Sequence, residues 1–350
     1  MEKKIKIAGR EVSEGNSPYV IAEMSANHNG NIETAFKIIE AAKQAGAEAI
    51  KLQTYRPDTI TLDSTCEEFM IKEGIWAGKS LFELYESAHL PWDWHKPLFE
   101  HARKLGITIF SSPFDNTAID LLEGLNAPAY KIASFEAVDL PLIKYAASTR
   151  KPMIISTGMA DADEIQDAIN AAREGGCKEL AILHCVSGYP APAQDYNLQT
   201  ITDMIKRFGL VTGLSDHTLD NATAIASVAL GASIIEKHFT LDRNGGGPDD
   251  SFSLEPVEMA ALCQGVKTAW QALGQVDYGR KSSERGNLKF RRSIYFVSDL
   301  PAGSVVAEAD IRSVRPGMGL SPKHLDTLVG RRLKVDVTRG TATRWDLFEN

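Results

Sequence analysis

Two histidines in neighbouring strand-like segments are the residues whose type and spacing point most directly to chemistry. His217 lies near the end of segment 213–218 and His238 near the end of 234–239, and a helical pattern over about 219–230 separates them. In a strand–helix–strand unit both imidazoles emerge at the same edge of a parallel sheet. Neutral imidazole binds divalent transition metals, so the pair predicts an open metal site with positions free for a substrate oxygen. The alternative is a pair of buried, hydrogen-bonded structural histidines.

Polar residues also stand at the ends of the other strand-like segments. Some of them could simply cap helices, but a whole ring of polar strand ends predicts a site at that edge of the sheet. The ring comprises Glu23, Lys51, Gln53, Ser111, Ser112, Lys131, Ser134, Glu136, Ser156, Thr157, His184, Ser187, Ser215, Asp216 and Glu236.

Two lysines of this ring, Lys51 and Lys131, stand in apolar surroundings. An ammonium group suits a phosphate or carboxylate, and the neighbouring serines add neutral hydrogen bonds to such an anion. A Schiff-base lysine, as in a class I aldolase, is a second interpretation. The third is a structural ion pair with Glu23, Glu136 or Glu236.

The order of elements predicts the α/β class, as a (β/α)8 TIM barrel over residues 1–280. Eight short β-branched runs alternate with helical patterns, and no Gly-x-Gly-x-x-Gly follows the first run, which disfavours a dinucleotide-binding sheet. One helix is expected over 31–45 with Asn31 as its cap and Gly46 as its stop, and another over 256–273. The expected strands are 19–24, 49–53, 107–112, 129–134, 153–157, 180–185, 211–215 and 233–238.

Two stretches depart from this rhythm. Residues 64–95 form a long insertion with three tryptophans, which we interpret as a lid or an interface. Residues 281–292 are rich in charge, Gly and Ser and are typical of a linker. After them, 293–350 alternates as a small, mainly β domain.

Composition excludes several classes of protein. The chain has 350 residues and a formal net charge of −8, so it carries no global basic field for nucleic acid or an anionic membrane. Its four cysteines have no Cys-x-x-Cys spacing, which argues against a zinc knuckle or a disulfide frame. No signal peptide and no membrane-length apolar run is recognised. We therefore expect a cytoplasmic protein with reduced thiols.

Several segments together resemble the N-acylneuraminate (sialic acid) synthase family. They are 21–30 (IAEMSANHNG), 49–54 (AIKLQT), 130–136 (YKIASFE), 155–159 (ISTGM), 214–218 (LSDHT) and 236–239 (EKHF). Segment 314–319 (VRPGMG) resembles that family's C-terminal antifreeze-like (SAF, β-clip) domain. Within the family, 245–254 (GGGPDDSFSL), 76–79 with 81–85, 111–115 and 319–322 are similar to the pseudaminic acid synthase branch. Ser187 stands where sialic and legionaminic acid synthases often carry asparagine.

The resemblance implies an activity. Phosphoenolpyruvate would condense with an acylated amino-hexose, in this branch 2,4-diacetamido-2,4,6-trideoxy-L-altrose, and water attack with C–O cleavage would release phosphate. N-acetylmannosamine, as used by sialic acid synthases, or the related hexosamine of legionaminic acid synthases is the alternative sugar. A lysine aldolase and a non-catalytic sugar- or protein-binding protein are the remaining alternatives. The family's products enter flagellin and cell-surface polysaccharide glycosylation.

The resemblance also implies site roles. His217 and His238 would hold a divalent metal, Mn²⁺ first and Mg²⁺ or Co²⁺ otherwise. The catalytic carboxylates would be Glu23, Glu136 and Asp249. Phosphoenolpyruvate would bind Lys51, Lys131, Ser134, Ser156, Ser187 and Ser215. The sugar would contact Gln53, Phe114, Tyr189, Phe252 and Arg315, with Phe252 favouring a 6-deoxy methyl group. In a homodimer, Arg315 of the antifreeze-like domain would complete the partner's site.

Overall fold

The chain forms two compact units. The computed structural model describes residues 3–74 and 76–349. The first unit ends at Gly274 and the second begins at Gln275. The sequence pattern places the end of the barrel slightly later, at residue 280, with a linker over 281–292.

The first unit contains a closed barrel of eight parallel strands in the order β10-β3-β4-β5-β6-β7-β8-β9. Its closure pairs β10 with β3. This architecture confirms the (β/α)8 prediction, and the strand-like segments are all strands. They are β3 (Tyr19–Glu23), β4 (Ala49–Thr54), β5 (Thr108–Pro113), β6 (Tyr130–Ile132), β7 (Met153–Ser156), β8 (Leu180–Cys185), β9 (Val211–Asp216) and β10 (Ile234–His238).

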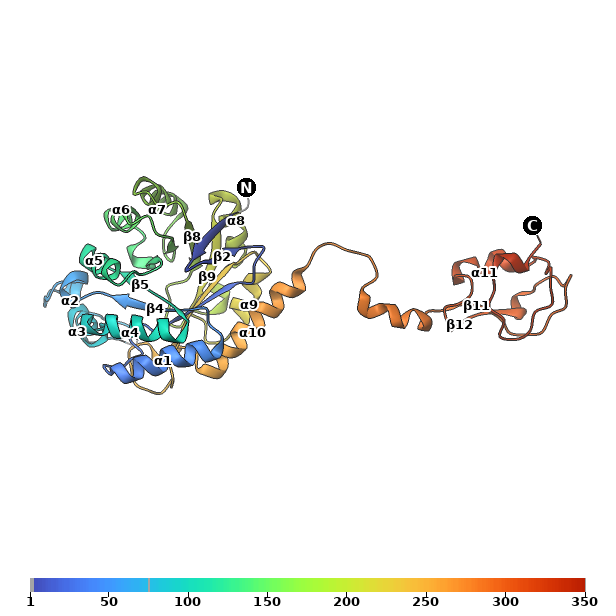
Figure 1. Cartoon of the computed structure of the whole chain (residues 1–350), viewed down its shortest axis with the longest axis horizontal. Helices are drawn as coiled ribbons and strands as arrows, with labels where there is room; N and C mark the ends of the chain where they lie inside the picture. The colour runs from blue at the N-terminus through green and yellow to red at the C-terminus, as the bar shows by residue number, and fades with distance from the viewer. Residues whose placement is uncertain (1–2, 75, 350) are drawn as a thin grey trace. The chain divides into compact units, whose positions relative to one another are not determined.

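Helices surround the barrel strands in Figure 1 and bury an apolar face against them. In the first of them the Asn31 side chain accepts from the amide of Glu33, and Gly46 ends the helix at φ +92°, a left-handed conformation that glycine adopts without strain. The last carries Pro256 at its first turn. The helices are α1 (Ile32–Ala45), α4 (Trp92–Leu105), α5 (Asn116–Gly124), α6 (Leu140–Ser148), α7 (Ala162–Glu174), α8 (Gln199–Phe208), α9 (Ala222–Val228) and α10 (Pro256–Leu273).

A hairpin that the sequence reasoning missed precedes the barrel. Strands β1 (Lys4–Ile7) and β2 (Arg10–Ser13) pair antiparallel. Ile5, Ile7 and Val12 are buried in one cluster with the inward residues at the amino-terminal ends of the barrel strands. Packing at that end leaves the carboxyl-terminal end of the barrel for loops and chemistry.

The insertion 64–95 carries local structure. It holds the turn η1 (Glu67–Phe69) and helix α3 (Leu81–Ala88), follows helix α2 (Pro57–Ile60), and runs into α4. Trp92 anchors its end, because the indole Nε1 donates to the Tyr55 carbonyl at 3.2 Å.

The second unit is small and has a core of its own. Its first regular element is an exposed 3-10 helix, η5 (Ser282–Phe290). The antiparallel pair β11 (Ser293–Phe296) and β12 (Ile311–Val314) and the short helix α11 (Leu325–Leu328) follow. Ile294, Phe296 and Leu333 lie at the centre of its apolar cluster.

Among the residues that the structure describes, no helix combines the length and the apolar character needed to cross a bilayer.

Candidate active site

The paired histidines meet at the carboxyl-terminal end of the barrel. The register of β9 and β10 pairs Asp216 with Lys237, so His217 and His238 are the next residues on adjacent strands. Their ring centroids lie 5.4 Å apart. The prediction that one sheet edge presents both imidazoles is therefore confirmed in position.

Each imidazole keeps a nitrogen for a ligand. His217 Nδ1 lies 2.8 Å from the Val186 carbonyl, which only accepts hydrogen bonds, so this nitrogen carries a proton and Nε2 is the atom that would bind a cation in the neutral ring. His238 Nδ1 is buried without a hydrogen-bond partner in residues 3–74 and 76–349. Burial and the neighbouring His217 hold the pKa of His238 well below its usual value, so the ring is neutral. An unsatisfied buried nitrogen argues against the purely structural interpretation and fits a bound cation.

No cluster of three or more His, Cys, Asp or Glu suited to a metal occurs in the described part of the chain. The Asp249 carboxylate lies 3.9 Å from His238 Nδ1. Two imidazoles are thus the residues that would hold a divalent ion here, and such an ion would supply a Lewis acid for a substrate oxygen.

The two lysines lie beside this pair, and both are buried. Register pairs His238 with Glu23 and Glu23 with Lys51, which places three inward side chains in one row across β10, β3 and β4. Lys51 Nζ lies 3.0 Å from Glu23 Oε2 and 3.3 Å from Glu236 Oε1. Lys131 Nζ lies 3.2 Å from the same Glu236 oxygen. The ion-pair interpretation therefore describes these contacts, with Glu23 and Glu236 as partners rather than Glu136.

The carboxylates of the site differ in protonation. Burial opposes ionisation of Glu236, yet Lys131 and Lys51 outweigh it and lower the pKa of Glu236 to about 2. Burial raises the pKa of Glu23 in spite of Lys51, and burial raises the pKa of Asp249. Burial also raises the pKa of Glu136 to about 7. One carboxylate is thus a fixed anion, and Glu136 is poised to exchange a proton near neutral pH.

The serines assigned to phosphoenolpyruvate lie at the ends of barrel strands or just after them. Ser215 donates to Glu236 Oε1 at 3.2 Å, and the Ser156 hydroxyl is buried with no partner among the described residues. Ser134 accepts from the Gly158 amide at 3.2 Å. A Cβ at Gly158 would come within 2.3 Å of Ser187 Oγ and 2.8 Å of Ser134 Oγ, so only glycine leaves room between these two hydroxyls.

Aromatic rings border the histidines on the side expected to hold the sugar. The Tyr189 ring centroid lies 4.4 Å from that of His217 and 5.3 Å from that of Phe252. Phe252 is buried and lies 5.1 Å from the His238 ring. Trp76, from the insertion, lies 6.0 Å from Tyr189. The insertion therefore forms one wall of the site.

Gln53 links the sugar side to the carboxylates. Its Nε2 donates to Glu23 Oε1 at 3.0 Å and to Ser25 Oγ at 2.9 Å. Ser25 in turn donates to Asp249. Phe114 lies further out, with its ring 5.2 Å from Tyr55.

Arg315 lies in the second unit. It follows β12 and is exposed. Its action on a partner's site stays a prediction.

Sequence reasoning left three contributors to the site without a specific role. Glu236 stood in the predicted ring of polar strand ends and was considered as an ion-pair partner, and its oxygen accepts from both Lys131 and Ser215. Ser25 follows directly after β3. Lys237 alternates out of the barrel between Glu236 and His238, and this strand alternation was the available signal.

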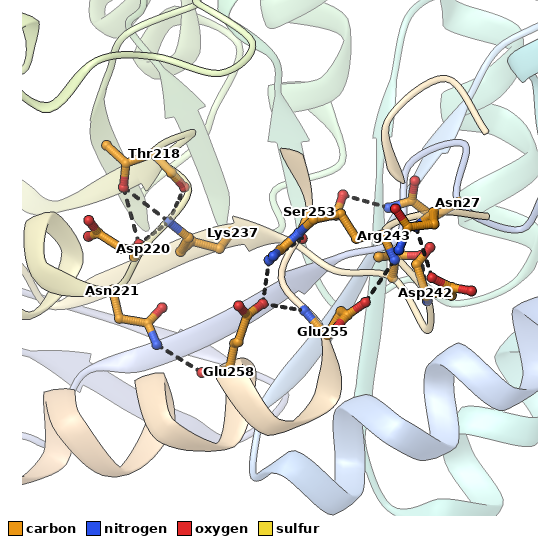
Figure 2. A network of polar contacts seen from close by, with 12 residues as sticks. Asn27, Thr218, Asp220, Asn221, Lys237, Asp242, Arg243, Ser253, Glu255 and Glu258 are labelled. Atoms are coloured by element: carbon orange, nitrogen blue, oxygen red, sulfur yellow. Dashed lines mark hydrogen bonds and ion pairs between the residues drawn. The ribbon is translucent and has the colours of Figure 1, made fainter. Parts of the chain in front are cut away.

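Hydrogen bonds outside the barrel hold the loops that carry the site (Figure 2). Asn27 Nδ2 donates to Phe239 O at 2.9 Å and to Ser253 Oγ at 2.8 Å. Ser253 Oγ donates to Asp249 O at 2.7 Å. Arg243 donates to Ser253 O at 3.2 Å. The segment after β10 is thus fixed on both sides of Asp249.

The sequence model described as the NeuB family matches residues 38–278, more than half of the chain. The chain belongs to the NeuB family. A second model, that of the SAF domain, matches residues 291–349. The resemblance to sialic acid synthases is thereby confirmed, together with its antifreeze-like appendage.

Sequence identity to individual relatives differs between branches of the NeuB family. The pseudaminic acid synthase of Campylobacter jejuni is 42% identical over 93% of this chain and 95% of its own length. The N,N'-diacetyllegionaminic acid synthase of Legionella pneumophila is 35% identical over 95% of this chain and 94% of its own. Among solved structures, the N-acetylneuraminic acid synthetase of Leptospira borgpetersenii matches with a TM-score of 0.73 at 30% identity, over 83% of this chain and 97% of that one.

Proposed function

We propose that this NeuB-family chain is a pseudaminic acid synthase. It condenses phosphoenolpyruvate with 2,4-diacetamido-2,4,6-trideoxy-L-altrose. The methylene carbon of phosphoenolpyruvate bonds to the sugar aldehyde carbon, water adds to the second carbon, and the C–O bond to phosphate breaks. The products are phosphate and a nine-carbon 2-keto acid.

One observation supports this reaction most strongly, namely the buried lysine pair beside the paired imidazoles at one end of the barrel. The lysines and the four serines bind the phosphate and carboxylate, while Gln53, Tyr189 and Asp249 orient the sugar. A divalent metal on His217 and His238, Mn²⁺ by family preference with Mg²⁺ or Co²⁺ as substitutes, polarises the aldehyde oxygen when bound.

The carboxylates of the site differ in whether they exchange protons during the reaction. Glu236 stays ionised because Lys131 and Lys51 hold its pKa low, and its negative charge offsets the repulsion between the two ammonium groups. Glu136, with a pKa of about 7, and Glu23, whose pKa is also raised, are the groups able to exchange protons with water and the developing hydroxyl.

We assign the chain to the pseudaminic branch, and not to the legionaminic or sialic branch, because its sequence identity to that branch is higher. The chain is 42% identical to the Campylobacter pseudaminic acid synthase and 35% identical to the Legionella enzyme. A homodimer, completion of the site by Arg315 and a cytoplasmic location belong to the same proposal.

The deciding experiment is a substrate panel with metal-free protein. Phosphate release from phosphoenolpyruvate is measured with the L-altrose derivative, its legionaminic precursor and N-acetylmannosamine, with and without added Mn²⁺. We expect Mn²⁺-dependent release with the first sugar at a kcat/KM at least about tenfold above the others. Preference for another sugar would reassign the branch. Turnover without metal, together with borohydride trapping of a carbonyl substrate on Lys51 or Lys131 in a separate experiment, would favour the aldolase.

A further inference from the structure

Lys237 occupies an unusual position between two functional residues. Glu236 and His238 point into the barrel, so by strand alternation Lys237 points outward, under the helical layer. It is only 2% exposed. A buried ammonium group is costly unless each of its protons finds an acceptor.

Four oxygens accept from Lys237 Nζ. They are Asp216 Oδ2 at 2.9 Å, the Thr218 carbonyl at 2.7 Å, Thr218 Oγ1 at 3.3 Å and the Asp220 carbonyl at 2.7 Å. Figure 2 shows the contacts with Thr218 and Asp220. Two of these acceptors are backbone carbonyls, so the lysine holds the path of the main chain and not merely another side chain.

These acceptors flank His217 on both sides. Asp216 precedes it, and Asp216 Oδ1 also accepts from the Thr218 amide at 2.9 Å. Thr218 and Asp220 follow it. Lys237, which directly precedes His238, therefore hydrogen-bonds to the main chain after His217 and to the Asp216 side chain before it.

We propose that Lys237 is a positioning residue that sets the separation and orientation of His217 and His238 by tying the end of β10 to the turn after β9. This inference rests on the proposed metal-assisted function. It predicts that loss of the ammonium group weakens metal binding while anion binding by Lys51 and Lys131, on the inner face of the barrel, is retained.

The test compares Lys237→Met, which keeps length without charge, with Asp216→Asn, which removes the charged acceptor and keeps the shape of the side chain. A matched control is Lys151→Met, since Lys151 is a half-buried lysine paired with Glu123 elsewhere in the barrel. Metal-free proteins are titrated with Mn²⁺, and free Mn²⁺ is followed by electron paramagnetic resonance at a temperature where circular dichroism shows each variant folded. Phosphoenolpyruvate binding is measured separately in the presence of chelator.

We expect Mn²⁺ affinity to fall about 10- to 100-fold in both test variants and to stay at the wild-type value in Lys151→Met. Phosphoenolpyruvate affinity should change by less than about threefold, whereas general loosening of the barrel would weaken both ligands. A folded Lys237→Met protein with wild-type Mn²⁺ affinity overturns the inference alone. If Lys237→Met does not fold, unchanged affinity in Asp216→Asn overturns it. Wild-type protein that binds no Mn²⁺ overturns both this inference and the metal-assisted function.

Discussion

At the scale of residues, the site separates its carboxylates by environment. Glu236 lies between two lysines and is held as an anion, whereas Glu136 is desolvated and its pKa rises to about 7. Two side chains of the same type are thereby suited to different roles, one as a permanent counter-ion and the other as a proton carrier.

The raised pKa of Glu136 predicts how the free energy of unfolding depends on pH. Its folded pKa lies above the ordinary value of 4.5, so its stabilising contribution is complete below pH 4.5 and is lost as the pH rises through about 7. Glutamine does not ionise, so the Glu136→Gln variant does not lose this stability as the pH rises. Its free energy of unfolding relative to wild type should therefore be higher at pH 8 than at pH 5, by on the order of 2–3 kcal/mol. Urea unfolding at both pH values measures it. A stability difference that does not change with pH would contradict the raised pKa.

At the scale of elements, the insertion and the loop after β10 build one wall together. Trp76 Nε1 donates to the Pro248 carbonyl at 3.2 Å, and its ring faces Tyr189. Because Pro248 adjoins Asp249, this contact joins the insertion to a sugar-side carboxylate.

This wall should affect the sugar more than phosphoenolpyruvate. Trp76→Phe deletes one hydrogen bond of about 1 kcal/mol and should raise KM for the sugar about fivefold while KM for phosphoenolpyruvate stays unchanged. Initial rates with each substrate varied in turn measure the two constants. Trp270→Phe is the control, because its indole donates to the Glu14 carbonyl, away from the site. Equal effects on both substrates would exclude a specific role for this wall.

At the scale of the whole molecule, the proposed role of the second unit in the reaction depends on Arg315. In the proposed homodimer this arginine acts on the partner's barrel, where its forked guanidinium suits hydroxyl or acyl oxygens. The arrangement makes each site depend on two chains.

Hybrid dimers test this dependence. Arg315→Ala and His238→Ala proteins should each be inactive, and an equal mixture should recover about a quarter of wild-type activity, since about half of the dimers are hybrid and each has one complete site. Native mass spectrometry confirms subunit exchange. Exchange without recovered activity would show that Arg315 does not act in trans.

The sequence by itself determined the barrel fold and the end of the barrel at which the candidate site lies. Strand and helix periodicities are local, so they revealed eight units, and the polar residues at strand ends marked His217, His238, Lys51 and Lys131. Parallel strands bring their carboxyl ends to one edge, which made the meeting of the histidines predictable.

Only the tertiary structure decided which of these groups touch. Closing the ring sets β10 beside β3, and that pairing of distant segments brings Glu236 between Lys51 and Lys131. The amino-terminal hairpin and Trp76 were likewise assigned by packing across the chain. Contacts of this kind depend on which distant elements pack side by side. The local periodicity of a sequence does not predict that, because it reports only on residues a few positions apart.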